Sequence, residues 1–354
     1  MKKKLSPRQW LGAVIILLLF ILLTFFLYGT FHEDSKFEKF TEELFKSEMC
    51  ANPINLHFTL TDASKYGIDE SAVTLPIYQA GEAHRNKGRA DEVLLSLKQF
   101  NPDRLSSVNQ YTYILLSSYL TASKENASYL YYEEPLSPSS GIQSGLPLLL
   151  SEYRISSVDD IENYLSILTQ IPSYLEGIIL YEQEKAKQGL FMSDSSVDKV
   201  IEQCTALMDA HKLESGEHFL ETTFEQRLND LVTQGIISET QAQSWISENN
   251  RLLLTVIAPA YDKLADELTL LKGSGTNLQG LAYYPDGQEY YQAYLRINTG
   301  SYRSIPEIKE MLAKDFEKNF TAMLTLFRQN PDLNALLADS NSYFPALAPE
   351  DMLL

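Results

Sequence analysis

The chain has few of the side chains that build covalent frameworks or metal sites. Its 354 residues include two cysteines, Cys50 and Cys204, and five histidines. Two cysteines do not make a disulfide framework, which excludes the class of small cross-linked secreted domains. Cys204 also falls within an apolar helical stripe, where a buried free thiol is the ordinary outcome. The stability of this chain must therefore come from packing.

Short catalytic motifs are missing as well. The sequence contains no His-Glu-x-x-His segment, no Gly-x-Ser-x-Gly elbow and no phosphate-binding Gly-x-x-x-x-Gly-Lys loop. His211 and His218 are seven residues apart, with Glu214 and Glu217 nearby. Gly216 interrupts this stretch, which is typical of a turn between helices, so we expect solvated surface histidines there. We predict no catalytic residue and no metal ligand in this chain.

Positive charge is scarce. The chain carries 29 basic and 47 acidic residues, for a net charge of −18. A surface of this sign repels phosphate backbones, which argues against nucleic acid as a partner. The acidity is typical of a protein that is kept soluble after export.

A short basic segment at the N-terminus precedes one long apolar run. Residues 1–9 form a basic tail, and the run from Trp10 to Tyr28 contains no charge over nineteen residues. Such a run is about long enough to cross a bilayer as a helix, and positive flanks stay cytoplasmic. We predict a transmembrane signal-anchor over 10–30 and an extracytoplasmic domain over 31–354. A cleaved signal peptide is the alternative, although cleavage after Gly29 or Thr30 would leave Leu27 or Tyr28 at the minus-three position, where a small residue is required.

Convincing period-two strands are absent, and apolar residues recur at helical spacing. The fold class that we predict is all-α, a large multi-helix domain preceded by one transmembrane helix. Ser157, Ser238 and Ser304 are expected to cap helices. Pro172 is expected to start a new helix, and 135–147 to form a loop. The helix after Ser304 should present an apolar stripe to the core. The residues of this stripe are Ile308, Met311, Leu312, Phe316, Phe320, Met323 and Phe327.

The most informative local sequence is rich in tyrosine. It runs from Gly280 to Tyr294, with a turn signal at Pro285-Asp-Gly287. Aromatic rings with a polar tip suit a groove that binds peptide or sugar, and packing of a helix start against the core is the alternative. The predicted substrate-cleft residues are Tyr283, Asp286, Gly287, Tyr290, Tyr291 and Tyr294.

This segment resembles the Gly-Leu-x-x-Leu-Pro-Asp-Gly-x-x-Tyr-Tyr signature of the bacterial "domain of unknown function 885" family, which is placed near the zinc metallopeptidases. Tyr284 stands where leucine is common. Segments near 37–57, 136–153 and 189–194 resemble the firmicute branch. The resemblance implies a helical fold, and Asp286, Gly287, Tyr290 and Tyr291 match the signature.

The activity implied by the resemblance depends on a His-Glu-x-x-Pro-Gly-His segment downstream of the signature, which is not in this chain. Zinc is therefore expected only if a further C-terminal part is present. Residues 349–354 look like a first helical turn, so we expect the chain to stop inside an element. Two hypotheses follow. The chain is the N-terminal portion of a membrane-anchored zinc metallopeptidase-like protein acting on extracytoplasmic peptides, or it is a non-catalytic extracytoplasmic module that binds a peptide or partner.

Overall fold

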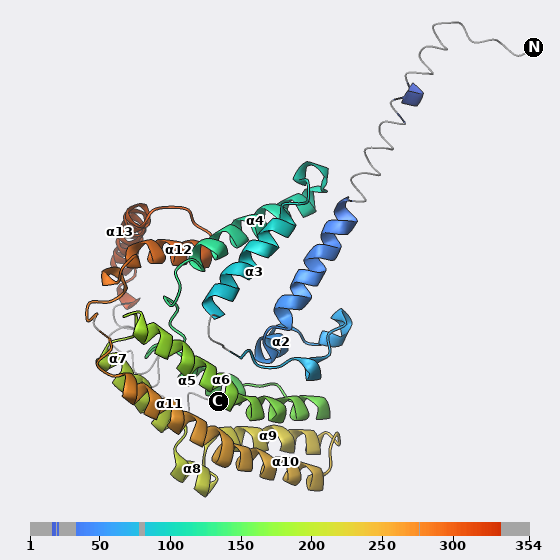
Figure 1. The fold of residues 1–354 in the computed structure, drawn as a ribbon, viewed down its shortest axis with the longest axis vertical. Coiled ribbons are helices and arrows are strands. Elements are labelled where there is room, and N and C mark those ends of the chain that lie inside the picture. Colours follow the sequence, from blue (N-terminus) through green and yellow to red (C-terminus); the bar gives the residue numbers. More distant parts are fainter. Residues whose placement is uncertain (1–15, 19, 21–32, 78–81, 276, 334–354) are drawn as a thin grey trace, which may run out of the picture. The chain divides into compact units, whose positions relative to one another are not determined.

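The computed structural model describes residues 16–18, 20, 33–77, 82–275 and 277–333, and in this part every regular element is helical (Figure 1). The all-α prediction is confirmed. A helix over residues 33–49 comes first. The labelled α-helices are α2 (Pro53–Thr59), α3 (Glu82–Leu97), α4 (Ser107–Asn126), α5 (Ile142–Ser151), α6 (Val158–Lys187), α7 (Asp194–Leu207), α8 (Ala210–Ser215), α9 (Phe219–Thr233), α10 (Glu239–Leu252), α11 (Ala258–Leu271), α12 (Gly287–Thr299) and α13 (Ile305–Gln329).

Short helical turns join these elements. Four are 3₁₀ turns, and the fifth is a π-helical segment between α10 and α11. Pro259 is the second residue of α11. The five turns are η1 (Ala63–Tyr66), η2 (Glu70–Ala72), η3 (Pro102–Arg104), η4 (Leu253–Ile257) and η5 (Leu281–Tyr283).

The prediction of a transmembrane helix was wrong. Among the described residues, none of the helices combines the length and the apolar character that a membrane crossing requires. Most of the predicted span over 10–30 lies outside the described residues, as do the boundaries at 9/10 and 30/31 and the predicted chain end at 349–354. The cellular location stays a prediction.

The chain divides into two compact units, Met1–Ile297 and Asn298–Leu354. The main core of the first unit forms around α6, with side chains from α5, α7 and α9 to α11. Apolar residues at Ile161, Tyr164, Leu168, Ile171 and Leu175 give α6 a stripe at three- and four-residue spacing, and all five are buried. Two smaller cores lie around Phe37 and around Leu56.

Helix α6 is the longest described element, with 30 residues, and it runs without a break through Pro172. The predicted helix start at Pro172 was therefore wrong, because burial on both sides of the proline favours one continuous helix. Ser157 caps α6 as predicted, and its hydroxyl accepts a hydrogen bond from the main-chain N–H of Asp160. Neighbouring helices pack as pairs, α9 beside α10 and α7 beside α11 (Figure 1).

Two further expectations need correction. The predicted loop over 135–147 becomes helical at Ile142, where α5 begins and carries Pro147 inside it. In the second unit, α13 has its predicted capping box at Ser304 and Glu307, but none of its residues is buried. Phe316 is 71% exposed. The amphipathic pattern predicted the helix correctly, but the prediction that its apolar face would pack against the core was wrong.

Candidate functional site

The tyrosine-rich segment begins with a tight turn that leads into α12. Asp286 has a positive φ of 52°, and the N–H of Gly287 donates to the carbonyl oxygen of Tyr284 at 3.1 Å. A Cβ at Gly287 would collide with the carbonyl oxygen of Leu281. Glycine is therefore required at this position by the closeness of the backbone. The Asp286–Gly287 pair is therefore explained by the backbone geometry of the turn.

The predicted tyrosines divide into two groups. Tyr290 is buried, with 5% of its surface exposed. Tyr283, Tyr291 and Tyr294 are all exposed. Tyr291 and Tyr294 are three positions apart on α12 and so lie on neighbouring parts of its surface. Tyr284, at the position where this chain departs from the signature, donates from its hydroxyl to the carbonyl oxygen of Phe191 at 2.9 Å.

A distant segment completes this site. The ring of Tyr290 lies 5.7 Å from that of Tyr129 and 5.0 Å from that of Tyr132, between centroids. Tyr132 also meets Tyr284 edge to face at 6.4 Å. Tyr129, Tyr132, Tyr284, Tyr290 and Tyr294 are called the tyrosine cluster below. Sequence reasoning missed the residues of segment 129–134, although the run Tyr129-Leu-Tyr-Tyr-Glu-Glu134 was a visible signal of aromatic enrichment.

A buried charged pair near the end of α6 is electrostatically coupled to this cluster. Lys185 donates from Nζ to the carbonyl oxygen of Glu133 at 2.8 Å. The same Nζ lies 3.9 Å from Oε2 of Glu182. Neither carboxylate oxygen of Glu182 has a hydrogen-bond partner, and the residue has no exposed surface. Such a group is costly to keep charged.

Burial raises the pKa of Glu182 to about 7; the ammonium of Lys185 opposes this rise, and the charge of Glu134 adds to it. Burial also raises the pKa of Tyr284, and Glu134 and Glu182 raise it further. A carboxyl with a pKa near neutrality can exchange a proton at working pH. Glu182 is sealed from solvent, however, so we assign it no part in binding or catalysis.

The tyrosine cluster does not provide the donors of a zinc site, since it contains no histidine or cysteine. His218 is buried, contrary to the expectation of a solvated histidine; it caps α9, and its Nε2 lies 2.7 Å from the carbonyl oxygen of Leu207. Cys50 is exposed, Cys204 is buried, and both are free. Among the described residues, one group of His, Asp and Glu is close enough to hold a metal, namely His57, Glu70 and Asp160.

Comparison with known families covers most of the chain. A family described as "Bacterial protein of unknown function (DUF885)" matches residues 61–352. The chain belongs to this family. The match includes the tyrosine cluster, α6 and the group of His, Asp and Glu near its start, apart from His57.

A solved structure is similar to this DUF885 chain. It is the crystal structure of a protein described as a lipoprotein from Colwellia psychrerythraea, with a TM-score of 0.64 and 14% sequence identity. The likeness covers 86% of this chain and 52% of the other, so the chain spans about half the length of that structure. At this identity the likeness shows the fold alone. No curated protein matches the chain.

Proposed function

We propose that this chain is the helical portion of a zinc metallopeptidase-like DUF885 protein that acts on extracytoplasmic peptides, and that the exposed tyrosines of α12 bind the peptide. Family membership supports the coarse part of this proposal. The peptidase-like role rests on the resemblance of the signature segment. The residues of the tyrosine cluster do not fit a zinc ion, so no catalytic step is assigned to them.

The observation that carries the proposal is the arrangement of the phenols on α12. Tyr291 and Tyr294 are 41% and 45% exposed, whereas Tyr290 behind them is buried among the rings of Tyr129 and Tyr132. A phenol ring offers a large apolar face and a polar tip, and it loses little conformational entropy on binding. The packing of Tyr290 against the rings of Tyr129 and Tyr132 holds α12 in place, and the exposed rings are presented on the same helix.

A peptide-binding experiment tests this proposal. A mixture of unstructured peptides is equilibrated with the 354-residue chain, and the bound fraction is identified by mass spectrometry. We expect Tyr291→Ala to weaken binding by about tenfold, as is common for an aromatic anchor. Tyr111→Ala is the matched control, because Tyr111 is 64% exposed but lies on α4 and not on α12. Equal loss in both variants, or no peptide bound at all, would contradict the proposal.

A second measurement separates the peptidase-like role from that of a non-catalytic binding module. The chain is incubated with the peptides that it binds, with and without Zn²⁺, and we expect no cleavage. Cleavage would place catalytic residues within this chain and overturn the assignment made above. A His-Glu-x-x-Pro-Gly-His segment encoded beyond residue 354 would favour the peptidase-like role, and its absence there would favour the binding module.

A further inference from the structure

Three ligand-type side chains meet at the start of α6. His57 comes from α2, Glu70 from η2, and Asp160 from the first turn of α6. One ligand atom from each lies within 4.8 Å of the other two. Nδ1 of His57 lies 3.8 Å from Oε2 of Glu70. Three elements that are separate in the sequence therefore direct an imidazole and two carboxylates to one point.

The imidazole of His57 lacks the partners that a buried polar group normally has. His57 is 2% exposed, and neither of its ring nitrogens has a hydrogen bond of normal geometry. Its ring stacks on that of Tyr153, with centroids 3.7 Å apart and planes 7° from parallel. Stacking accounts for one face of the ring and leaves the nitrogens at its edge unsatisfied. Most buried polar atoms in folded proteins are satisfied, so this one points to a missing partner.

The two carboxylates lie close together, because a carboxylate oxygen of Glu70 is within 4.8 Å of one of Asp160. Asp160 is held in place by Ser156, whose main-chain N–H and hydroxyl both donate to its Oδ2 at 2.8 Å. Hydrogen-bonded carboxylates of this kind are typical of oriented metal ligands. A cation between Glu70 and Asp160 would relieve their repulsion.

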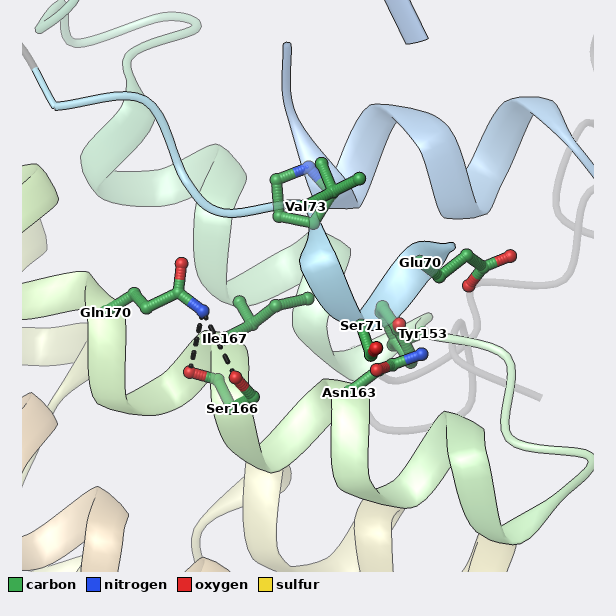
Figure 2. A pocket seen from close by; sticks show the side chains of 9 residues that line it. Glu70, Ser71, Val73, Tyr153, Asn163, Ser166, Ile167 and Gln170 are labelled. Carbon is green, nitrogen blue, oxygen red and sulfur yellow. Dashed lines mark hydrogen bonds between the residues drawn. The ribbon is translucent and has the colours of Figure 1, made fainter. Parts of the chain in front are cut away.

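The group has access to solvent through acidic surroundings. Glu70 and Asp160 line an open cavity of about 760 Å³, whose walls also carry Asp62, Asp159 and Glu162. A second cavity, of about 10 Å³, lies where the η2 turn meets α6; Figure 2 shows its side chains, with Glu70 and Ser71 on the turn and Asn163 on α6. That volume is about the space of one water molecule.

Arg154 is the basic group that opposes a cation here. Its Nη2 approaches the carbonyl oxygens of His57 and Leu60 at 3.5 and 3.4 Å. The guanidinium thus has contacts of its own with the main chain. One Arg charge does not offset Glu70 and Asp160 together with the acidic wall of the cavity.

We propose that His57, Glu70 and Asp160 bind one divalent transition-metal ion of the Zn²⁺ type, which joins α2 and η2 to the start of α6. In tetrahedral coordination with bonds of about 2.0–2.2 Å, ligand atoms lie roughly 3.4 Å apart. The ligand atoms, which lie within 4.8 Å of one another, therefore need to move closer by at most about 1.4 Å. An imidazole ligand favours Zn²⁺ over Ca²⁺ and Mg²⁺, which prefer oxygen. The fourth position faces the cavity and is open to water.

This site differs from the sequence prediction, which assigned no metal ligand to the chain. It also stands apart from the proposed peptide-binding function, since it shares no residue with the tyrosine cluster. Sequence reasoning could not find it, because 13 positions separate His57 from Glu70 and a further 90 separate Glu70 from Asp160. No motif spacing connects such distant ligands.

Metal titration of the full chain tests the proposal. The protein is stripped with a chelator, exchanged into buffer and titrated with ZnCl₂ in a calorimeter. We expect one Zn²⁺ per chain, and an affinity at least tenfold lower in Glu70→Gln. His211→Gln is the control, since His211 lies outside the group and outside the cavity, and it should leave the affinity unchanged.

Glu70→Gln is the preferred variant because Glu70 is partly exposed and its replacement keeps the shape of the side chain. His57→Gln is a second variant, examined only if circular dichroism shows that it folds. Co²⁺ provides an independent readout, because a site with nitrogen and oxygen ligands should give visible absorption that Glu70→Gln removes. Absence of stoichiometric Zn²⁺ binding, or equal affinity in Glu70→Gln and the parent chain, would overturn the proposal. A response to Mg²⁺ as strong as that to Zn²⁺ would also overturn it.

Discussion

The two ends of α6 each bury a polar group without a hydrogen-bond partner, but the surroundings of these groups differ. Near the start of the helix, His57 lies against Asp160 and Glu70 beside an open acidic cavity. Glu182 lies 22 residues after Asp160, roughly 33 Å further along the helix at 1.5 Å per residue. It has no exposed surface, and the nearby phenol of Tyr284 is sensitive to its charge.

The difference shows how a buried polar group can be accommodated in two ways. Where the surroundings are charged and open, a ligand from solvent can supply the missing partner. Where they are sealed from solvent, a buried carboxyl avoids the cost of carrying a charge by taking up a proton, and its pKa is therefore raised. The start of α6 therefore points to a bound ion and its end to a neutral acid.

The largest effect is expected from Glu182→Gln. The pKa of Glu182 is about 7 in the folded chain and about 4.5 when unfolded. The folded state thus holds a proton that the unfolded state loses, and stability falls as pH rises from 4.5 to 7. We expect the variant to be more stable than the parent chain by roughly 1–3 kcal/mol at pH 8, and about equal to it at pH 4. Denaturant unfolding at both pH values measures this.

Glu184→Gln is the matched control for this comparison. Glu184 lies on the same helix but is partly exposed and pairs with Lys187. Its variant should change stability by less than about 1 kcal/mol at either pH. If the stability of Glu182→Gln relative to the parent chain is also the same at pH 4 and pH 8, Glu182 is not sealed from solvent. The two ends of α6 would then not differ in the way described.

Gly287→Ala should disturb the turn that positions Tyr284 and Tyr290 near the end of α6. The added Cβ meets the carbonyl oxygen of Leu281, so the turn must shift, and we expect a loss of about 2 kcal/mol. Tyr284 and Tyr290 would move with the turn, and the pH dependence that Glu182 causes should become smaller. Gly88→Ala is the control, because a Cβ there meets nothing within 4 Å. Unchanged stability in Gly287→Ala would show that the turn relaxes freely.

Arg154→Gln tests the electrostatics of the proposed metal site at the start of α6. The side chain of Gln can still donate to main-chain carbonyl oxygens, but the positive charge is gone. We expect the affinity for Zn²⁺ to rise by about threefold to tenfold, because a like charge no longer opposes the ion. Calorimetric titration beside the parent chain measures this. Lower affinity would mean that Arg154 orients the ligands more than it repels the metal.

The smallest effect is expected from Ser157→Ala. Its hydroxyl caps α6, and loss of an N-cap costs about 1 kcal/mol. Hydrogen exchange should become faster in the first turn of α6 and stay unchanged near Glu182. Faster exchange along the whole helix would show that α6 opens as one unit and that its two ends cannot be treated separately.

Local signals in the sequence predicted much of the fold. The caps at Ser157, Ser238 and Ser304 are present because capping is decided within one helical turn. Pro172 misled because the propensity of proline to break a helix was outweighed by tertiary packing on both sides of it. The apolar face of α13 misled in another way, since periodicity indicates which side chains share a face and not what that face meets.

The candidate sites were less predictable than the helices. Of the predicted cleft tyrosines, Tyr283, Tyr291 and Tyr294 are exposed and Tyr290 is buried, and their role in binding stays a prediction. The rings that pack against Tyr290 come from segment 129–134, and the ligand set near His57 comes from three separate elements. Pairings of this kind are set by how helices pack, which one sequence does not reveal.

The turn at Gly287 bears on how sequence likeness to this segment is interpreted. The backbone at Asp286 and Gly287 is restricted by a positive φ and by the closeness of the Leu281 carbonyl. Any chain that folds this way must satisfy the same restriction, whatever it binds. An Asp-Gly match in a newly sequenced protein is therefore a marker of shared backbone geometry, and it carries no information about the reaction that protein performs.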